Sequence, residues 1–104
     1  MTKDELLKQI KSAVREVEPT AEIWLYGSRA RGDAEADSDW DFLVVVEGET
    51  SDDRERRLWR RLFDLELEVG EVLSAILVSR RDWDGLRRET MPLYQSVVRE
   101  GAPV

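Results

Sequence analysis

Two aspartates, Asp39 and Asp41, stand two positions apart at the start of an apolar run. The run over 40–46 reads Trp-Asp-Phe-Leu-Val-Val-Val, which predicts a buried β-strand. Side chains two apart on a strand share a face, with Cα atoms roughly 6.5–7 Å apart. Two carboxylates that converge in this way repel each other, and a shared cation relieves the repulsion. Magnesium prefers such oxygen ligands and completes its shell with water and substrate phosphates. The pair therefore predicts a divalent-metal site.

A Gly-Ser turn lies ahead of this acidic pair. Gly27 and Ser28 directly follow a predicted strand over Glu22–Tyr26, and a short helix is expected to begin at Ser28. Glycine lets another group approach the backbone closely, and the N-terminus of a helix directs free N–H groups at an anion. The turn is therefore interpreted as a phosphate-binding loop. Arg29 and Arg31 add positive charge beside it, or alternatively only neutralise the acidic residues that follow.

The composition restricts the chemistry that is available. The chain has 104 residues with no Cys and no His, so disulfides, thiolate metal sites, His-ligated zinc and Ser-His-Asp triads are excluded. Asp and Glu total 23 against 16 Lys and Arg, a net charge of -7 that disfavours direct nucleic-acid binding. No apolar run is long enough for a signal peptide or a membrane span. We expect one cytoplasmic domain over residues 1–104, with no membrane association.

Two long amphipathic helices are predicted. The first begins after a capping residue, Thr2, and runs to Val17 with apolar residues at helical spacing. The second begins at Ser51 and ends at Gly70, a residue suited to the C-terminal cap. Alternating charges along this second helix predict a solvated, salt-bridged outer face. Trp59 lies off its core stripe, which indicates a surface for a homodimer or another partner.

Strands alternate with these helices. Besides 22–26 and 40–46, a third strand is predicted over Val72–Val78, and Ser79 begins a further helical segment. Tyr94–Arg99 fits either a helix or a short edge strand. The alternation predicts an α/β (α+β) domain on a small mixed sheet of three to four strands. We expect the helices mainly on one face and the acidic pair on the other.

The combined motif resembles a known family. Gly27-Ser28, ten further residues and then Asp39-Trp40-Asp41-Phe42 are similar to the signature of the DNA polymerase beta nucleotidyltransferase superfamily. The run Tyr-Gly-Ser-Arg-Ala-Arg-Gly and the chain length resemble the stand-alone minimal nucleotidyltransferases of bacteria and archaea, so the resemblance covers nearly the whole chain. It implies a nucleotidyltransferase fold and metal-dependent transfer of a nucleoside monophosphate, usually AMP from ATP, with release of pyrophosphate.

The resemblance also assigns roles to single residues. Asp39 and Asp41 would bind Mg²⁺ or Mn²⁺ and form the catalytic pair. Gly27 and Ser28 would contact the triphosphate of ATP, with Arg29 as a further nucleotide ligand. The mechanism that this implies is mostly positioning and charge stabilisation during in-line displacement.

One position departs from the family pattern. Many members carry a third carboxylate on the next strand, where Ser74 stands in this chain. Glu71 is the nearest acid that a shifted register would bring into that place. Two hypotheses follow. The first is an enzyme that transfers AMP to a hydroxyl, and the second is a catalytically degenerate module that binds nucleotide or neutralises a partner by contact. The intact acidic pair favours the enzyme.

A partner protein is implied by the same resemblance. In the resembled family the acceptor is often a tyrosine on a small helical HEPN toxin ribonuclease, which makes the nucleotidyltransferase the antitoxin of a toxin–antitoxin system. A chain of 104 residues has room for the nucleotide-binding half of a transferase and not for an acceptor half. We therefore expect a separate helical partner, in addition to the nucleoside triphosphate.

Overall fold

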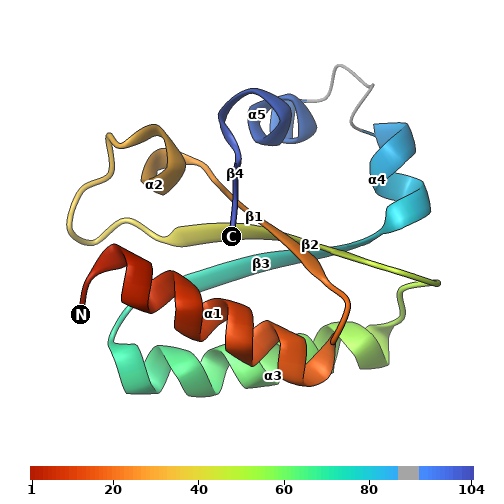
Figure 1. Cartoon of the computed structure of the whole chain (residues 1–104), viewed down its shortest axis with the longest axis horizontal. Helices are drawn as coiled ribbons and strands as arrows, with labels where there is room; N and C mark the ends of the chain where they lie inside the picture. Colours follow the sequence, from red (N-terminus) through yellow and green to blue (C-terminus); the bar gives the residue numbers. More distant parts are fainter. Residues whose placement is uncertain (87–91) are drawn as a thin grey trace.

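A mixed sheet of four strands organises the chain, in the order β3-β2-β1-β4 (Figure 1). The computed structural model describes residues 1–86 and 92–104. Neighbouring strands are antiparallel, except that β2 and β3 run parallel. The strands are β1 (Glu22–Tyr26), β2 (Trp40–Val46), β3 (Leu73–Ser79) and β4 (Ala102–Pro103).

Five helices are described between these strands: α1 (Lys3–Val17), α2 (Ser28–Arg31), α3 (Asp52–Val69), α4 (Arg80–Leu86) and α5 (Pro92–Glu100). The predicted caps of the two long helices are confirmed. Thr2 Oγ1 accepts the Glu5 N–H at 3.1 Å, and Ser51 Oγ accepts the Arg54 N–H at 3.2 Å. Gly70 ends α3 in a left-handed conformation with φ 72°. No helix among the described residues is long and apolar enough to cross a bilayer.

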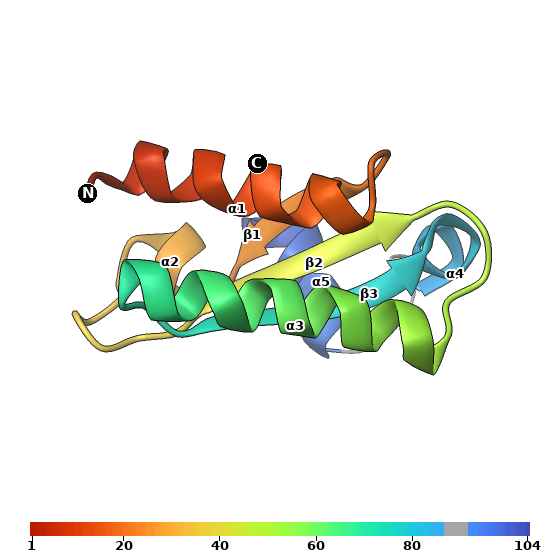
Figure 2. The same cartoon turned by 90° about the horizontal axis from the view of Figure 1, so that it is seen from below.

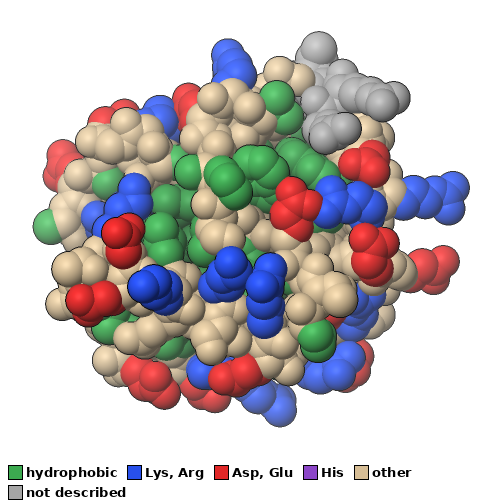
Figure 3. All heavy atoms as spheres, in the orientation of Figure 1, with side chains coloured by type: hydrophobic (Ala, Val, Ile, Leu, Met, Phe, Trp, Pro, Cys, Tyr) green, Lys and Arg blue, Asp and Glu red, His purple; other side chains and the backbone are tan. Residues whose placement is uncertain are grey.

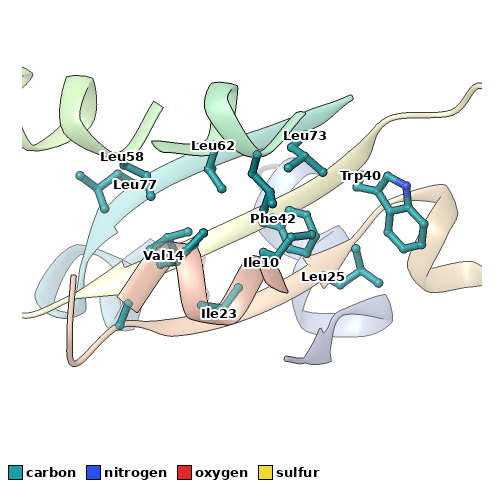
Figure 4. Packing of buried hydrophobic residues seen from close by; sticks show 14 of the residues in the cluster. Ile10, Val14, Ile23, Leu25, Trp40, Phe42, Leu58, Leu62, Leu73 and Leu77 are labelled. Atoms are coloured by element: carbon teal, nitrogen blue, oxygen red, sulfur yellow. The ribbon is translucent and has the colours of Figure 1, made fainter. Parts of the chain in front are cut away.

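The main core lies between the sheet and the two long helices. Figure 2 shows α1 and α3 side by side across one face of the sheet. Alternate residues of β2 point toward them, and fully buried Phe42 meets Ile10 of α1 and Leu62 of α3 in one cluster (Figure 4). Trp40 closes the same cluster at the end of β2 from which the site loop arrives.

Two shorter helices cover part of the opposite face. Trp83 of α4 and Val97 of α5 are buried against Leu43 and Val45 of β2. The long helices thus share one face, as expected, and the acidic pair lies on the side of the sheet that α4 and α5 partly cover. The segment 94–99, predicted as helix or strand, belongs to α5. The short strand β4 was not predicted.

Candidate functional site

The acidic pair lies where β2 begins. Asp41 is half-buried and is the register partner of Tyr26 on β1 and of Ser74 on β3. Asp39 is exposed and lies in the loop directly before the strand. Burial raises the pKa of Asp41 above its usual value, and the neighbouring charge of Asp39 raises it further. The two carboxylates therefore lie close enough to repel each other, as their spacing predicts.

The Gly-Ser turn is in direct contact with this pair. Gly27 has φ 74°, and a Cβ at this position would lie only 2.8 Å from Asp41 Oδ2. Only glycine combines this left-handed backbone with the close approach of a carboxylate. Helix α2 begins immediately afterwards, with the N–H groups of Ala30 and Arg31 donating to the Gly27 carbonyl at 3.1 and 3.0 Å. The predicted phosphate-binding turn and the predicted metal ligands therefore adjoin.

Arg29 points into the loop that connects α2 to β2. Its guanidinium donates to the Ser38 carbonyl at 3.0 Å and to the Ala36 carbonyl at 3.2 Å, and it lies 4.5 Å from the centre of the Trp40 ring. The Arg29 side chain is only 16% exposed. In this structure Arg29, which was predicted as a nucleotide ligand, contacts the loop that leads into Asp39. No feature of the sequence alone distinguishes these two roles.

Glu71 lies on the other face of the sheet from Asp41. Its Oε2 accepts a hydrogen bond from Trp40 Nε1 at 3.3 Å and is 3.9 Å from Arg29 Nη2. Since Trp40 and Asp41 point to opposite faces of β2, a carboxylate bound to the indole is turned away from the acidic pair. Of the two alternatives for the third acidic position, the register therefore favours Ser74, which is exposed on the face of Asp41.

Two neighbours of the site carry contacts that were not predicted from the sequence. Tyr26 is buried, and its pKa is raised by burial and by the charges of Asp41 and Tyr94. Arg31 joins α2 to α5 through Glu100, with Nη1 and Oε2 3.0 Å apart; its pair with Asp33 is the contact that the alternative role of this arginine predicts. The position of Tyr26, directly before the Gly-Ser turn, could have indicated that it adjoins the site. The ion pair between Arg31 and Glu100 spans 69 positions, so no local sequence pattern could have predicted it.

The donor chemistry of the site fits a divalent cation. Asp39 and Asp41 supply carboxylate oxygens, and Ser28 and Ser74 lie nearby in the chain fold as neutral oxygen donors. Within residues 1–86 and 92–104, no third acidic side chain joins the pair to complete a protein-only metal cluster. Magnesium is commonly bound by one or two carboxylates together with substrate phosphates. The site therefore suits a metal that arrives with, or is completed by, a phosphate-bearing ligand.

Charges of both signs are mixed on the visible surface. Figure 3 shows acidic and basic side chains interspersed around one face of the molecule, with apolar side chains gathered near its centre. The net charge of the whole chain is -7. A surface of this kind offers little non-specific attraction to a nucleic-acid backbone.

Comparisons with known proteins relate this arrangement to characterised folds. Residues 7–90 match the family model described as Nucleotidyltransferase domain. A protein provisionally named minimal nucleotidyltransferase superposes with a TM-score of 0.64 at 26% identity, covering 100% of this chain and 97% of that chain. A chain from a mutant MntA-HpeT toxin–antitoxin complex gives a TM-score of 0.63 at 26% identity, covering 94% of this chain and 70% of that chain.

A third structure shows likeness of fold. It is a tri-AMPylated Shewanella oneidensis HEPN toxin in complex with MNT antitoxin, with a TM-score of 0.62 at 19% identity. The match covers 98% of this chain and 71% of that chain. Comparison with curated protein sequences gave no significant match.

Proposed function

The chain belongs to the nucleotidyltransferase domain family, and on this premise we propose that it transfers AMP from ATP to a hydroxyl group of a partner protein. The observation that carries the proposal is the contact between Gly27 and Asp41. A Cβ added at Gly27 would lie 2.8 Å from the Asp41 carboxylate. A reaction at the α-phosphate needs metal ligands and phosphate contacts within a few ångströms of each other. This contact is support for such a site.

Each member of the site then has a role. Asp39 and Asp41 would hold Mg²⁺ or Mn²⁺, and the bound ion would neutralise the charge of the phosphates. Gly27 keeps the turn open to the triphosphate, and Ser28 offers its hydroxyl and its backbone N–H to a phosphate oxygen. Arg29 positions the loop before Asp39. The acceptor oxygen would form a bond to the α-phosphorus while the bond from the α-phosphorus to the pyrophosphate oxygen breaks, and the hydroxyl proton would pass to water.

A HEPN-type toxin is the partner that the similarities favour. The MntA-HpeT complex contains a chain 26% identical to this one over 94% of its length. The structure with tri-AMPylated HEPN toxin shares the fold and shows a modified toxin beside an MNT antitoxin. These similarities support the proposal that the chain is an antitoxin that inactivates a helical partner by adding AMP, with a tyrosine as the expected acceptor.

A second candidate function rests on Ser74. The register places this serine, rather than an acid, opposite Asp41. A neutral hydroxyl is a weak metal ligand and does not serve as a general base. A chain of this kind fits a module that retains nucleotide binding and neutralises its partner by contact, without transfer of AMP.

Intact-mass measurement separates the two functions. The chain is co-expressed with the product of the neighbouring open reading frame as the candidate partner, and the purified complex is incubated with Mg²⁺ and ATP. The enzyme predicts a mass gain of one or more AMP units on the partner, lost in Asp39→Asn and Asp41→Asn. Asp37→Asn is the matched control, since Asp37 is an exposed acid of the same loop outside the pair. A stable complex with no mass change would reject AMP transfer and support the contact-only module.

A further inference from the structure

Helix α3 carries an apolar stripe that the fold leaves exposed. Trp59, Phe63 and Leu67 follow one another at intervals of four and are 50%, 57% and 73% exposed. Residues four apart lie on the same side of a helix, so the three side chains form one continuous stripe. The core contact of α3 uses a different set of residues, Leu58, Leu62 and Leu65. An exposed stripe of this size on a soluble domain marks an interaction surface.

The stripe borders the outer edge of the sheet. Trp59 Nε1 donates to the Ala75 carbonyl of β3 at 3.4 Å, and Glu66 Oε1 accepts the Leu73 N–H at 2.8 Å. A hollow of about 430 Å³ lies between the helix and the strand, with Trp59, Phe63 and Ala75 in its lining. The Ala75 carbonyl and the Leu73 N–H at this edge are already hydrogen-bonded to side chains of α3. A molecule bound against the stripe would therefore make mainly apolar contacts with the helix.

Over residues 56–68 of α3, the charges change sign at the centre of the stripe, after an acidic first turn that contains Asp52 and Asp53. Arg56 and Arg60 precede Phe63, and Asp64 and Glu68 follow it. All four side chains are exposed, and in the described part of the chain none is within ion-pair distance of another residue, although Asp64 and Glu68 interact electrostatically with Arg61. At 3.6 residues per turn, Arg60, Asp64 and Glu68 lie on the side of the stripe that faces away from β3. The part of this surface that lies within two turns of Phe63 is therefore basic on its N-terminal side and acidic on its C-terminal side.

We infer that this face of α3 binds a second copy of the same chain, with the two helices antiparallel. A two-fold axis at Phe63 stacks Phe63 on its own counterpart and sets Trp59 against Leu67 of the second copy. The same axis brings Arg60 to the level between Asp64 and Glu68 of the second copy. The surface is thus complementary to itself in both its apolar contacts and its charges. An isologous dimer requires this self-complementarity.

The dimer leaves the candidate active site open. Helix α3 packs on one face of the sheet through Leu62, whereas Asp41 points to the other face with Tyr26 and Ser74. Two copies joined through α3 would carry their acidic pairs on outward-facing surfaces, each accessible to nucleotide and to a partner. The inference is independent of the proposed function, because it needs neither metal nor ATP.

Sedimentation velocity of the full chain over a range of concentrations tests the inference. We expect a monomer–dimer equilibrium that shifts toward monomer at high salt, because the charges between the copies are screened. Phe63→Glu at the axis should weaken dimerisation by about tenfold or more. Val98→Glu is the matched control, since Val98 is 52% exposed on α5 and lies outside the stripe. Circular dichroism must show both variants folded, and Leu67→Glu serves as a second interface variant.

A charge exchange identifies the antiparallel arrangement. Arg60→Glu should weaken the dimer, and mixing it with a chain that carries Asp64→Arg and Glu68→Arg should restore association as a heterodimer. A folded chain that remains monomeric at every concentration overturns the inference, as does a Phe63→Glu variant that dimerises normally. If the chain is monomeric alone and Phe63→Glu abolishes binding of the HEPN-type protein, the face belongs to that partner and not to a second copy.

Discussion

Asp41 on β2 and Ser74 on β3 are register partners on neighbouring parallel strands. Residue pairs of this kind project their side chains from the same face of a sheet. The serine thus occupies the position from which an acid would reach the metal that Asp39 and Asp41 are proposed to bind. Glu71 does not compensate, because its carboxylate binds the Trp40 indole on the opposite face.

Ser74→Asp should create a three-carboxylate site. Without divalent metal, the added charge beside Asp39 and Asp41 should lower the thermal stability. With Mg²⁺ or Mn²⁺, affinity should rise by about tenfold or more, because ligand charge tunes cation affinity. Thermal melting at graded Mn²⁺ concentrations measures both effects. Ser74→Asn is the control of similar size without charge, and equal metal affinity in the two variants would contradict the assigned position.

Gly27→Ala should damage the site more than the fold. The new methyl group meets Asp41 Oδ2 at 2.8 Å, and the backbone at φ 74° and ψ -158°, a conformation almost confined to glycine, adds a cost of about 1–3 kcal/mol. Gly32→Ala is a close control, since Gly32 has φ 83° but no atom within 4 Å of an added Cβ. Both variants should lose stability by chemical denaturation, Gly27→Ala the more because only it adds a steric clash, and only Gly27→Ala should also lose metal binding and AMP transfer. Similar metal affinity in both would show that the contact with Asp41 is unimportant.

Arg29→Met should release the loop before Asp39. The change removes hydrogen bonds to the Ala36 and Ser38 carbonyls and the contact with Trp40, with an expected cost of about 1–3 kcal/mol in the free energy of unfolding. Hydrogen exchange should become faster in the loop over residues 33–38. Arg57→Met is the control, because its exposed pair with Asp53 should contribute less than about 1 kcal/mol.

The same variant distinguishes the two roles considered for Arg29. If the guanidinium binds the triphosphate directly, Arg29→Met should raise the KM for ATP while the stability and loop exchange stay as in the wild type. If it positions the loop, stability falls first and metal affinity falls with it. Arg29→Lys should then recover little, because a single ammonium group cannot reproduce the forked contacts of a guanidinium.

Asp41 should make the metal-free protein less stable as the pH rises. Its folded-state pKa is raised above the ordinary value of 3.8 by burial and by Asp39, so the folded state binds more protons than the unfolded state. Stability from this group is complete below the ordinary value and is lost as the pH passes the raised value. Urea denaturation across this range should show a shallower decline in Asp41→Asn. Saturating Mg²⁺ should stabilise the wild type at neutral pH and have less effect on Asp41→Asn, which lacks a proposed metal ligand, and an identical metal-free pH profile in the two proteins would contradict the expected coupling.

The local structure around the site was largely predictable from the sequence. The apolar run after Asp39 and the cap at Ser51 specify their elements through side-chain alternation and a single hydrogen bond, both local features. The strand β3 begins and ends one position later than predicted. An apolar run does not define the ends of a strand to within one residue. The placement of Asp41 on a face shared with Ser74 depends on the parallel pairing of β2 with β3. The spacing in the sequence is enough to indicate Asp39 and Asp41 as a pair. The register of β2 with β3 is needed to identify Ser74 as the third position of the site.

What escaped prediction depends on contacts distant in the chain. Arg29 contacts Trp40 and Glu71 only after three separate segments meet, so its local sequence fits a phosphate ligand and a loop anchor equally. Strand β4 has two residues, Ala102 and Pro103, and exists because β1 offers a free edge. Neither residue type favours a strand. Segments of this kind take their conformation from the surface they reach.

The two edges of the sheet, at β3 and β4, are both protected, and this affects how the chain behaves at high concentration. Trp59 and Glu66 occupy backbone groups along β3, and Pro103 brings no N–H to β4. Exposed strand edges are templates for uncontrolled β-aggregation. These side chains therefore protect the folded chain from edge-to-edge pairing with other chains. Replacing Trp59 with a small residue would therefore remove more than an aromatic surface. It would expose a strand edge and favour fibrous or amorphous precipitation, whereas changes at Phe63 leave that protection in place.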